Sequence, residues 1–89
     1  MKIKEGFVIE KVGASYLAVA TGKIADEFHA LVRLNSTGAF LWYKLAEGER
    51  TRDELLSLML DEYDVTPEVA LRDITAFLES LRDAGILDV

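Results

Sequence analysis

Val65-Thr66-Pro67-Glu68 opens the longest amphipathic run of the chain and predicts the start of a helix. Thr66 is a good N-cap, and Pro67 in the first turn loses nothing by lacking an N–H. Glu68 meets the positive end of the helix dipole. We expect the helix to end at Gly85. Its buried stripe is predicted from apolar residues at helical spacing: Leu71, Ile74, Leu78 and Leu81, flanked by Ala70 and Phe77.

Two further helix starts precede this one. Asn35 and Ser36 are both good N-caps for a helix that runs through about Ala46 and is closed by Gly48. Its expected apolar face is formed by Phe40, Leu41, Trp42 and Leu45. Thr51-Arg52-Asp53-Glu54 has the pattern of a capping box. The helix that it starts carries Leu55, Leu56, Met59, Leu60 and Tyr63 at i, i+3, i+4 spacing. Across the three helices, eight side chains are predicted to be buried: Phe40, Leu41, Leu55, Met59, Ile74, Phe77, Leu78 and Leu81.

The first third of the chain has the alternation of strands. Residues 7–12 and 16–21 are rich in β-branched and aromatic side chains, and Gly13-Ala14-Ser15 between them predicts a hairpin with a three-residue loop. Residues 28–34 alternate again and predict a third strand. The last residues, 86–89, are expected to pack on the core or to extend the sheet. The fold class is therefore α+β and winged-helix-like, with a three-stranded antiparallel N-terminal sheet packed on three α-helices.

Composition limits the classes of protein. With 89 residues, 51% of them hydrophobic, we expect one domain over residues 1–89 with one core. No stretch reaches the roughly 18 apolar residues of a membrane span, and the first residues lack the apolar region of a signal peptide. The absence of cysteine fits a reducing compartment. We therefore expect a cytoplasmic protein with no membrane partner.

The order and spacing of several motifs resemble the PqqD family. These are Leu34-Asn35-Ser36-Thr37-Gly38-Ala39-Phe40-Leu41-Trp42, Gly48-Glu49-Arg50-Thr51, Glu62-Tyr63-Asp64-Val65 followed by Thr66-Pro67-Glu68, and the final Phe77-Leu78-Glu79-Ser80-Leu81 with Gly85-Ile86-Leu87. The likeness covers roughly residues 6 to 88. It implies a peptide chaperone, also called a precursor-peptide recognition element. Such a protein holds the leader of a ribosomally synthesised precursor peptide and presents it to a modifying enzyme, in the founding case a radical S-adenosylmethionine enzyme.

The resemblance also implies where the leader binds. In the family, the leader adds as an antiparallel strand to the third strand, in a groove against the third helix. Small or mixed side chains on the outer face of the third helix permit such an approach, and an edge strand offers unpaired backbone groups. The peptide-binding residues expected on this basis are Phe28, His29, Ala30, Leu31, Val32, Arg33, Val69, Arg72, Asp73 and Ala76.

The residues predict no catalytic or metal chemistry. His29 is the only imidazole, it lacks partners at a recognised ligand spacing, and exposure on a strand is its expected state. The serines lack the context of a nucleophile elbow. Phe40 and Trp42 are more consistent with core residues than with an aromatic binding pocket. We therefore expect a protein that is not an enzyme and that needs no cofactor.

Two other functions remain open from the sequence. Three helices with a β part also resemble a winged helix-turn-helix, which predicts a DNA-binding regulator. Charge argues against nucleic acid, because residues 36–89 carry five basic side chains against twelve acidic ones, and the third helix two against four. The other alternative is a protein–protein adaptor, a homodimer built through the same edge strand.

Overall fold

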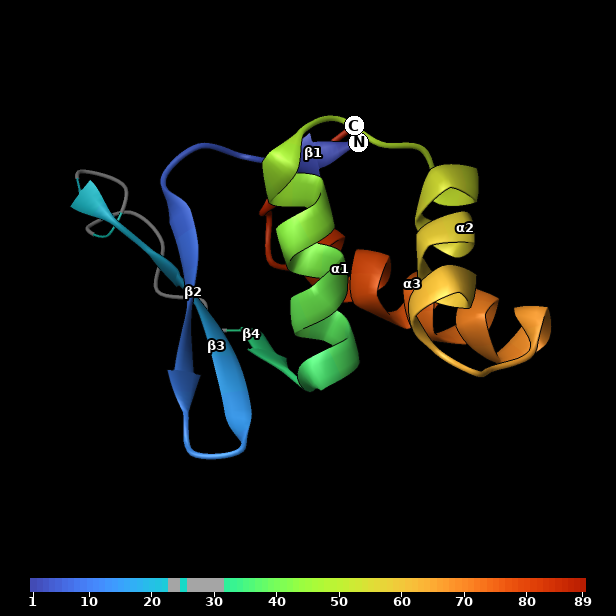
Figure 1. Cartoon of the computed structure of the whole chain (residues 1–89). Coiled ribbons are helices and arrows are strands. Elements are labelled where there is room, and N and C mark those ends of the chain that lie inside the picture. Colours follow the sequence, from blue (N-terminus) through green and yellow to red (C-terminus); the bar gives the residue numbers. More distant parts are fainter. Residues whose placement is uncertain (23–24, 26–31) are drawn as a thin grey trace.

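The computed structural model describes residues 1–22, 25 and 32–89, and Figure 1 shows the chain. Within these ranges four strands come first, followed by three helices and a short final strand. The strands are β1 (Lys2–Ile3), β2 (Phe7–Val12), β3 (Ser15–Ala20), β4 (Val32–Leu34) and β5 (Leu87–Asp88). The helices are α1 (Ser36–Glu47), α2 (Arg52–Glu62) and α3 (Pro67–Asp83). This order confirms the α+β class.

The main sheet is antiparallel and has the order β2-β3-β4. Val12 pairs with Ser15, so the hairpin turn has two residues, and the predicted three-residue loop was wrong. Gly13 adopts φ 61°, the conformation that a two-residue turn of type II′ requires at its first central position. Of the strand predicted over residues 28–34, the last three residues are confirmed as β4, and residues 28–31 lie outside the described residues.

A second, two-stranded sheet joins the two ends of the described chain. Lys2 pairs with Asp88 and Ile3 with Leu87, so β1 and β5 run antiparallel side by side. The N- and C-termini accordingly lie together in Figure 1. Strand β1 was not expected from the sequence. The final residues do pack on the core, because Ile86 is fully buried, but they do not extend the main sheet.

The predicted helix caps are confirmed. The Asn35 side chain caps α1, and the Thr66 side chain accepts from the Val69 N–H at the start of α3. Thr51 and Glu54 form both hydrogen bonds of the capping box. Gly85, with φ 76°, follows the last turn of α3 in a conformation that glycine adopts without strain. Within the described ranges, the helices are too short or too polar to cross a membrane.

The capping box makes stability depend on pH. The hydrogen bond from the Thr51 N–H, followed by the contact with the Thr51 side chain, lowers the pKa of the Glu54 carboxyl. A lowered folded-state pKa means that the carboxylate stabilises the fold above its unfolded-state pKa, and that this contribution is lost as pH falls through the folded-state pKa. Glu54→Gln keeps the box but removes the charge. Urea unfolding should show the wild type as the more stable protein near neutral pH, with a difference that begins to shrink near the ordinary glutamate pKa of about 4.3 and is lost as pH falls through the lowered folded-state pKa of Glu54. A difference independent of pH would contradict this account.

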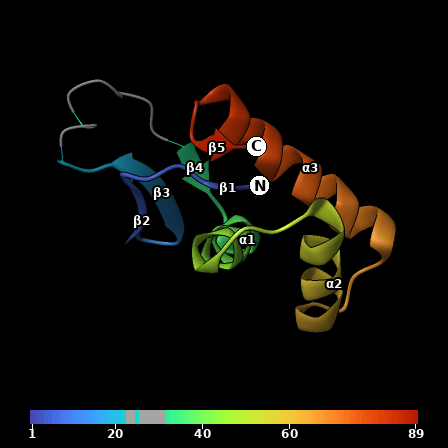
Figure 2. The ribbon, with the colours of Figure 1, turned by 90° about the horizontal axis from the view of Figure 1, so that it is seen from above.

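The core lies where the inner face of the main sheet meets the helices. Figure 2 shows the sheet on one side of α1 and α2 on the other, with α3 running across. Of the side chains predicted to be buried, seven are confirmed: Leu41, Leu55, Met59, Ile74, Phe77, Leu78 and Leu81. Trp42 is also buried, which confirms its assignment to the core.

The eighth, Phe40, is less buried than predicted, and so are Leu60 and Leu71 of the predicted apolar faces. Leu60 and Leu71 are each 37% exposed, because both lie at the margin of the apolar face of their helix, where the neighbouring elements no longer cover them. Phe40 is only half-buried and makes an edge-to-face contact with Tyr63, with the ring centres 5.4 Å apart. Helical periodicity correctly placed these side chains on the core-facing half of each helix. It did not show how far the neighbouring elements cover that half.

Candidate functional site

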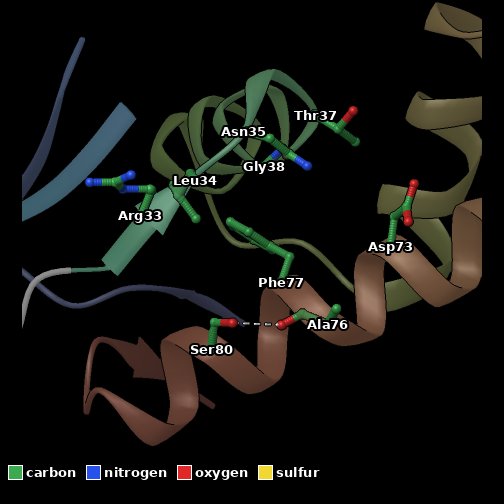
Figure 3. Close-up of a pocket in the computed structure, with 9 residues that line it drawn as sticks. All are labelled: Arg33, Leu34, Asn35, Thr37, Gly38, Asp73, Ala76, Phe77 and Ser80. Atoms are coloured by element: carbon green, nitrogen blue, oxygen red, sulfur yellow. Dashed lines mark hydrogen bonds between the residues drawn. The ribbon is translucent and has the colours of Figure 1, made fainter. Parts of the chain in front are cut away.

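A pocket of about 170 Å³ lies between the end of β4, the first turn of α1 and the middle of α3 (Figure 3). Its lining comes from three segments that the fold brings together: Arg33 and Leu34; Asn35, Thr37 and Gly38; and Asp73, Ala76, Phe77 and Ser80. The tight corner from β4 through Asn35 into α1 places the first two segments next to each other. Contact between α3 and β4 then brings the third segment opposite them.

Strand β4 forms one wall of this pocket as the edge of the main sheet. Among the described residues its only strand partner is β3, so alternate backbone N–H and C=O groups point away from that partner. Leu34 is buried on the inner face, and its side chain points toward Phe77 in Figure 3. Arg33 pairs with Leu17, is exposed, and points away from α3. On the side that faces α3 the strand therefore contributes an apolar side chain and its edge, whereas the Arg33 charge lies at the outer margin of the pocket.

The first turn of α1 closes the top of the pocket. The Asn35 side-chain oxygen accepts a hydrogen bond from the Gly38 N–H at 2.8 Å. A Cβ atom at Gly38 would lie 3.2 Å from the Cβ of Leu34, tighter than ordinary packing. The glycine thus lets the helix start directly against the strand, although glycine inside a helix costs about 1 kcal/mol relative to alanine. Close packing at this corner keeps Leu34 at the pocket wall.

The α3 wall has an apolar floor and a polar rim. Phe77 is 5% exposed and supplies the floor, and the exposed methyl of Ala76 leaves room above it. The Ser80 hydroxyl donates to the Ala76 carbonyl at 2.9 Å. The Asp73 carboxylate is half-exposed and lies 4.0 Å from Arg72 Nε, at the limit of an ion pair. Such a wall can accept an apolar side chain and offer acceptors to a polar group beside it.

The structure brings together three of the ten residues predicted to bind a peptide. Arg33, Asp73 and Ala76 line the pocket. Val32 packs against the core from the inner face of β4, whereas Val69 and Arg72 lie on α3 outside the pocket lining. The remaining four, Phe28, His29, Ala30 and Leu31, lie outside the described residues.

Six lining residues were not expected from the sequence: Leu34, Asn35, Thr37, Gly38, Phe77 and Ser80. Helical spacing did carry a signal for one of them, since Ser80 follows Asp73 and Ala76 at i+7 and i+4 on the same face. Phe77 was assigned to the core alone, and in fact it serves both the core and the pocket. The pocket is thus centred about one helical turn beyond the predicted face.

The described residues present no constellation for metal chemistry. In the described ranges, no group of three or more His, Asp or Glu side chains is placed to hold a metal ion. In the same ranges every buried side-chain polar atom has a hydrogen-bond partner. What the site offers is a strand edge, an apolar floor and a polar rim, which together define a binding module for an extended chain.

Comparison with known proteins agrees with this class. The model of the family described as coenzyme PQQ synthesis protein D (PqqD) matches residues 16–87 of the 89. The chain therefore belongs to the PqqD family. No curated protein matches it.

Two solved structures share the fold. One is that of TbiB1 in complex with the TbiA(beta) leader peptide, with a TM-score of 0.75 and 24% identity over 99% of this chain and 95% of the other. The second is lasso peptide synthetase B1 complexed with the leader peptide, with a TM-score of 0.68 and 21% identity over 96% of this chain and 93% of the other. Both were solved with a leader peptide bound.

Proposed function

We propose that this chain is a peptide chaperone that binds the leader of a ribosomally synthesised precursor peptide. The leader adds as an antiparallel strand to β4 and lies against α3. In this way the chaperone presents the rest of the precursor to a modifying enzyme. The observation that carries the proposal is the pocket beside the edge of β4 that has no strand partner among the described residues. Membership of the PqqD family and the leader peptides in both similar structures support it.

The proposed site combines two kinds of contact. Val32 and Arg33 of β4 supply backbone groups, and we propose the same role for Phe28, His29, Ala30 and Leu31, which lie outside the described residues. Asp73 and Ala76 form the opposite wall with Phe77 and Ser80. Val69 and Arg72, one turn earlier on α3, extend that wall along the peptide. A pocket of about 170 Å³ is large enough for one ring-sized side chain, since an engineered cavity of about 150 Å³ binds benzene.

Energetics require both kinds of contact. Each added ladder hydrogen bond contributes about 0.5–1.5 kcal/mol net. Burying one large apolar side chain in the pocket contributes about 1.5–3 kcal/mol. Micromolar affinity corresponds to about −8 kcal/mol after the cost of ordering the peptide. A peptide that uses only the edge or only the pocket therefore falls short, and specificity arises from the side chain that the pocket accepts.

The chain itself performs no catalysis in this proposal and needs no cofactor. Its partner is a modifying enzyme of the radical S-adenosylmethionine type or another peptide-modifying class, and both act in the cytoplasm. A DNA-binding role is disfavoured by charge, since α3 carries two basic side chains against four acidic ones. Placing that helix against a phosphate backbone would be repulsive.

Calorimetric titration with the leader of a precursor peptide encoded beside this chain tests the proposal. We expect saturable one-to-one binding and, in NMR spectra of the labelled protein, shifts of the β4 and α3 amides at the pocket. Random duplex DNA at low salt is the comparison probe and should not bind. Absence of leader binding, or binding to the duplex alone, would refute the chaperone function. Shifts confined to a different surface would refute the site.

A further inference from the structure

A second pocket, of about 180 Å³, lies on the other side of α3. Seven residues line it: Met1, Arg52, Leu78, Glu79, Arg82, Leu87 and Val89. At 100° per residue, its α3 residues point away from those at the first pocket. The two pockets therefore open on opposite faces of one helix, and an occupant of one leaves the other free.

Arg52 is held at this second pocket in an electrostatically unfavourable position. It is the first residue of α2, where the positive end of the helix dipole disfavours a cation. Its guanidinium donates to the Thr75 hydroxyl on α3 at 2.7 Å, which orients it but leaves its charge uncompensated. No carboxylate of the described residues lies within 4.0 Å of it. In a chain of net charge −6, a cation held by a neutral group is available for an external anion.

Arg82 supplies a second available guanidinium. Its only ion pair among the described residues is with the adjacent Asp83 at 3.4 Å, and the two side chains are 68% and 73% exposed. Ion pairs this exposed contribute little and are readily exchanged. One carboxylate side chain, that of Glu79, also lines the pocket. The lining side chains thus carry two positive charges against one negative. Residues 36–89 as a whole are, in contrast, acidic, with five basic side chains against twelve acidic ones.

The floor between these charges is apolar. Leu78 is 4% exposed and belongs to the core, and Leu87 packs against that core from β5. Val89 is 92% exposed at the rim. An apolar anchor beside a pair of arginines is the arrangement that accepts a hydrophobic side chain flanked by a carboxylate.

We propose that this second pocket docks an acidic segment of the modifying enzyme. An apolar side chain of that segment fills the floor over Leu78 and Leu87, and its carboxylate pairs with Arg52 and Arg82. The inference rests on the proposed chaperone function and deepens it. Leader and enzyme occupy opposite faces of α3 at the same time, so that the leader need not be released for the enzyme to bind.

The probe is a capped tetrapeptide of alternating aspartate and leucine, compared with its asparagine–leucine analogue, titrated into the full labelled chain. We expect the acidic peptide to shift the NMR amide resonances of Thr75, Leu78, Glu79 and Arg82. The neutral analogue should bind with an affinity at least about tenfold lower, which corresponds to the loss of a charge-assisted hydrogen bond. Arg52→Gln should lower the affinity for the acidic peptide to the same degree. Lys11→Gln, which removes an exposed cation of β2 outside both pockets, is the control and should leave binding of the acidic peptide unchanged.

Three outcomes would overturn the docking proposal. They are no shifts with the acidic peptide, equal shifts with both peptides, and equal affinity of the wild type and Arg52→Gln. A dimer in sedimentation that dissociates in Arg52→Gln would also overturn it, by assigning the pocket to a second copy of the chain. Leader affinity measured on the same Arg52→Gln protein should match the wild type. A leader that fails to bind either protein refutes the chaperone function instead, so the two failures are distinguishable.

Discussion

Ile74→Asp is expected to unfold most of the protein at room temperature. Ile74 is fully buried at the centre of the inner face of α3, within the core shared by the sheet and the helices. The substitution removes a large apolar side chain and places a carboxylate in a cluster of buried hydrophobic residues, at an expected loss of more than about 4 kcal/mol. Small domains have only about 5–15 kcal/mol of stability in total. Circular dichroism with urea unfolding measures the loss.

Leu71→Asp is the matched control on the same helix. Leu71 was predicted to belong to the same buried stripe, but it is 37% exposed, so its aspartate can reach water. We expect a loss of about 1–2 kcal/mol from reduced apolar burial and helix propensity. Equal losses at positions 71 and 74 would show that the inner face of α3 is wrongly assigned, as would an Ile74→Asp protein with unchanged melting.

Ala76→Arg is expected to abolish leader binding while leaving the fold intact. Ala76 is exposed on α3 and lines the first pocket opposite β4, where only a methyl group leaves room for a bound strand. A long charged side chain would fill that space, and we expect the leader affinity to fall by at least about a hundredfold, the loss of roughly 3 kcal/mol of contacts. Calorimetric titration gives the affinity, and circular dichroism confirms folding.

Ala46→Arg is the control for this substitution. Ala46 is exposed near the end of α1 and does not line the first pocket, so the variant adds the same side chain and charge to a helix surface elsewhere. Leader affinity should remain within about twofold of the wild type, since surface charges at a distance are largely screened. Wild-type affinity in a folded Ala76→Arg protein would exclude this pocket as the leader site.

Local chemistry in the sequence determined where the helices begin. Asn35, Thr51 and Thr66 each place a side-chain oxygen where the first free N–H groups of a helix need an acceptor, and each caps its helix as predicted. The buried stripe around Ile74 and Leu78 also follows from spacing alone. Both features depend on residues within one or two turns of one another, which is why one sequence is enough to predict them.

The residues that line the first pocket were predicted in part. The sequence and the family resemblance indicated a third strand facing the third helix, and Arg33, Asp73 and Ala76 do line one pocket. The first turn of α1 was not expected there. Its presence depends on how sharply β4 turns into α1, and that corner depends on the packing of Gly38 against Leu34.

Only the tertiary structure decided which margins of the helices are covered and which surfaces remain open. Leu60 and Leu71 fit the periodicity of buried residues but lie beyond the reach of neighbouring elements. The pairing of β1 with β5, and the hydrogen bond from Arg52 to Thr75 at the second pocket, join residues far apart in the chain. Such contacts depend on the angles at which whole elements pack, and these angles follow from the summed fit of many side chains rather than from any local pattern.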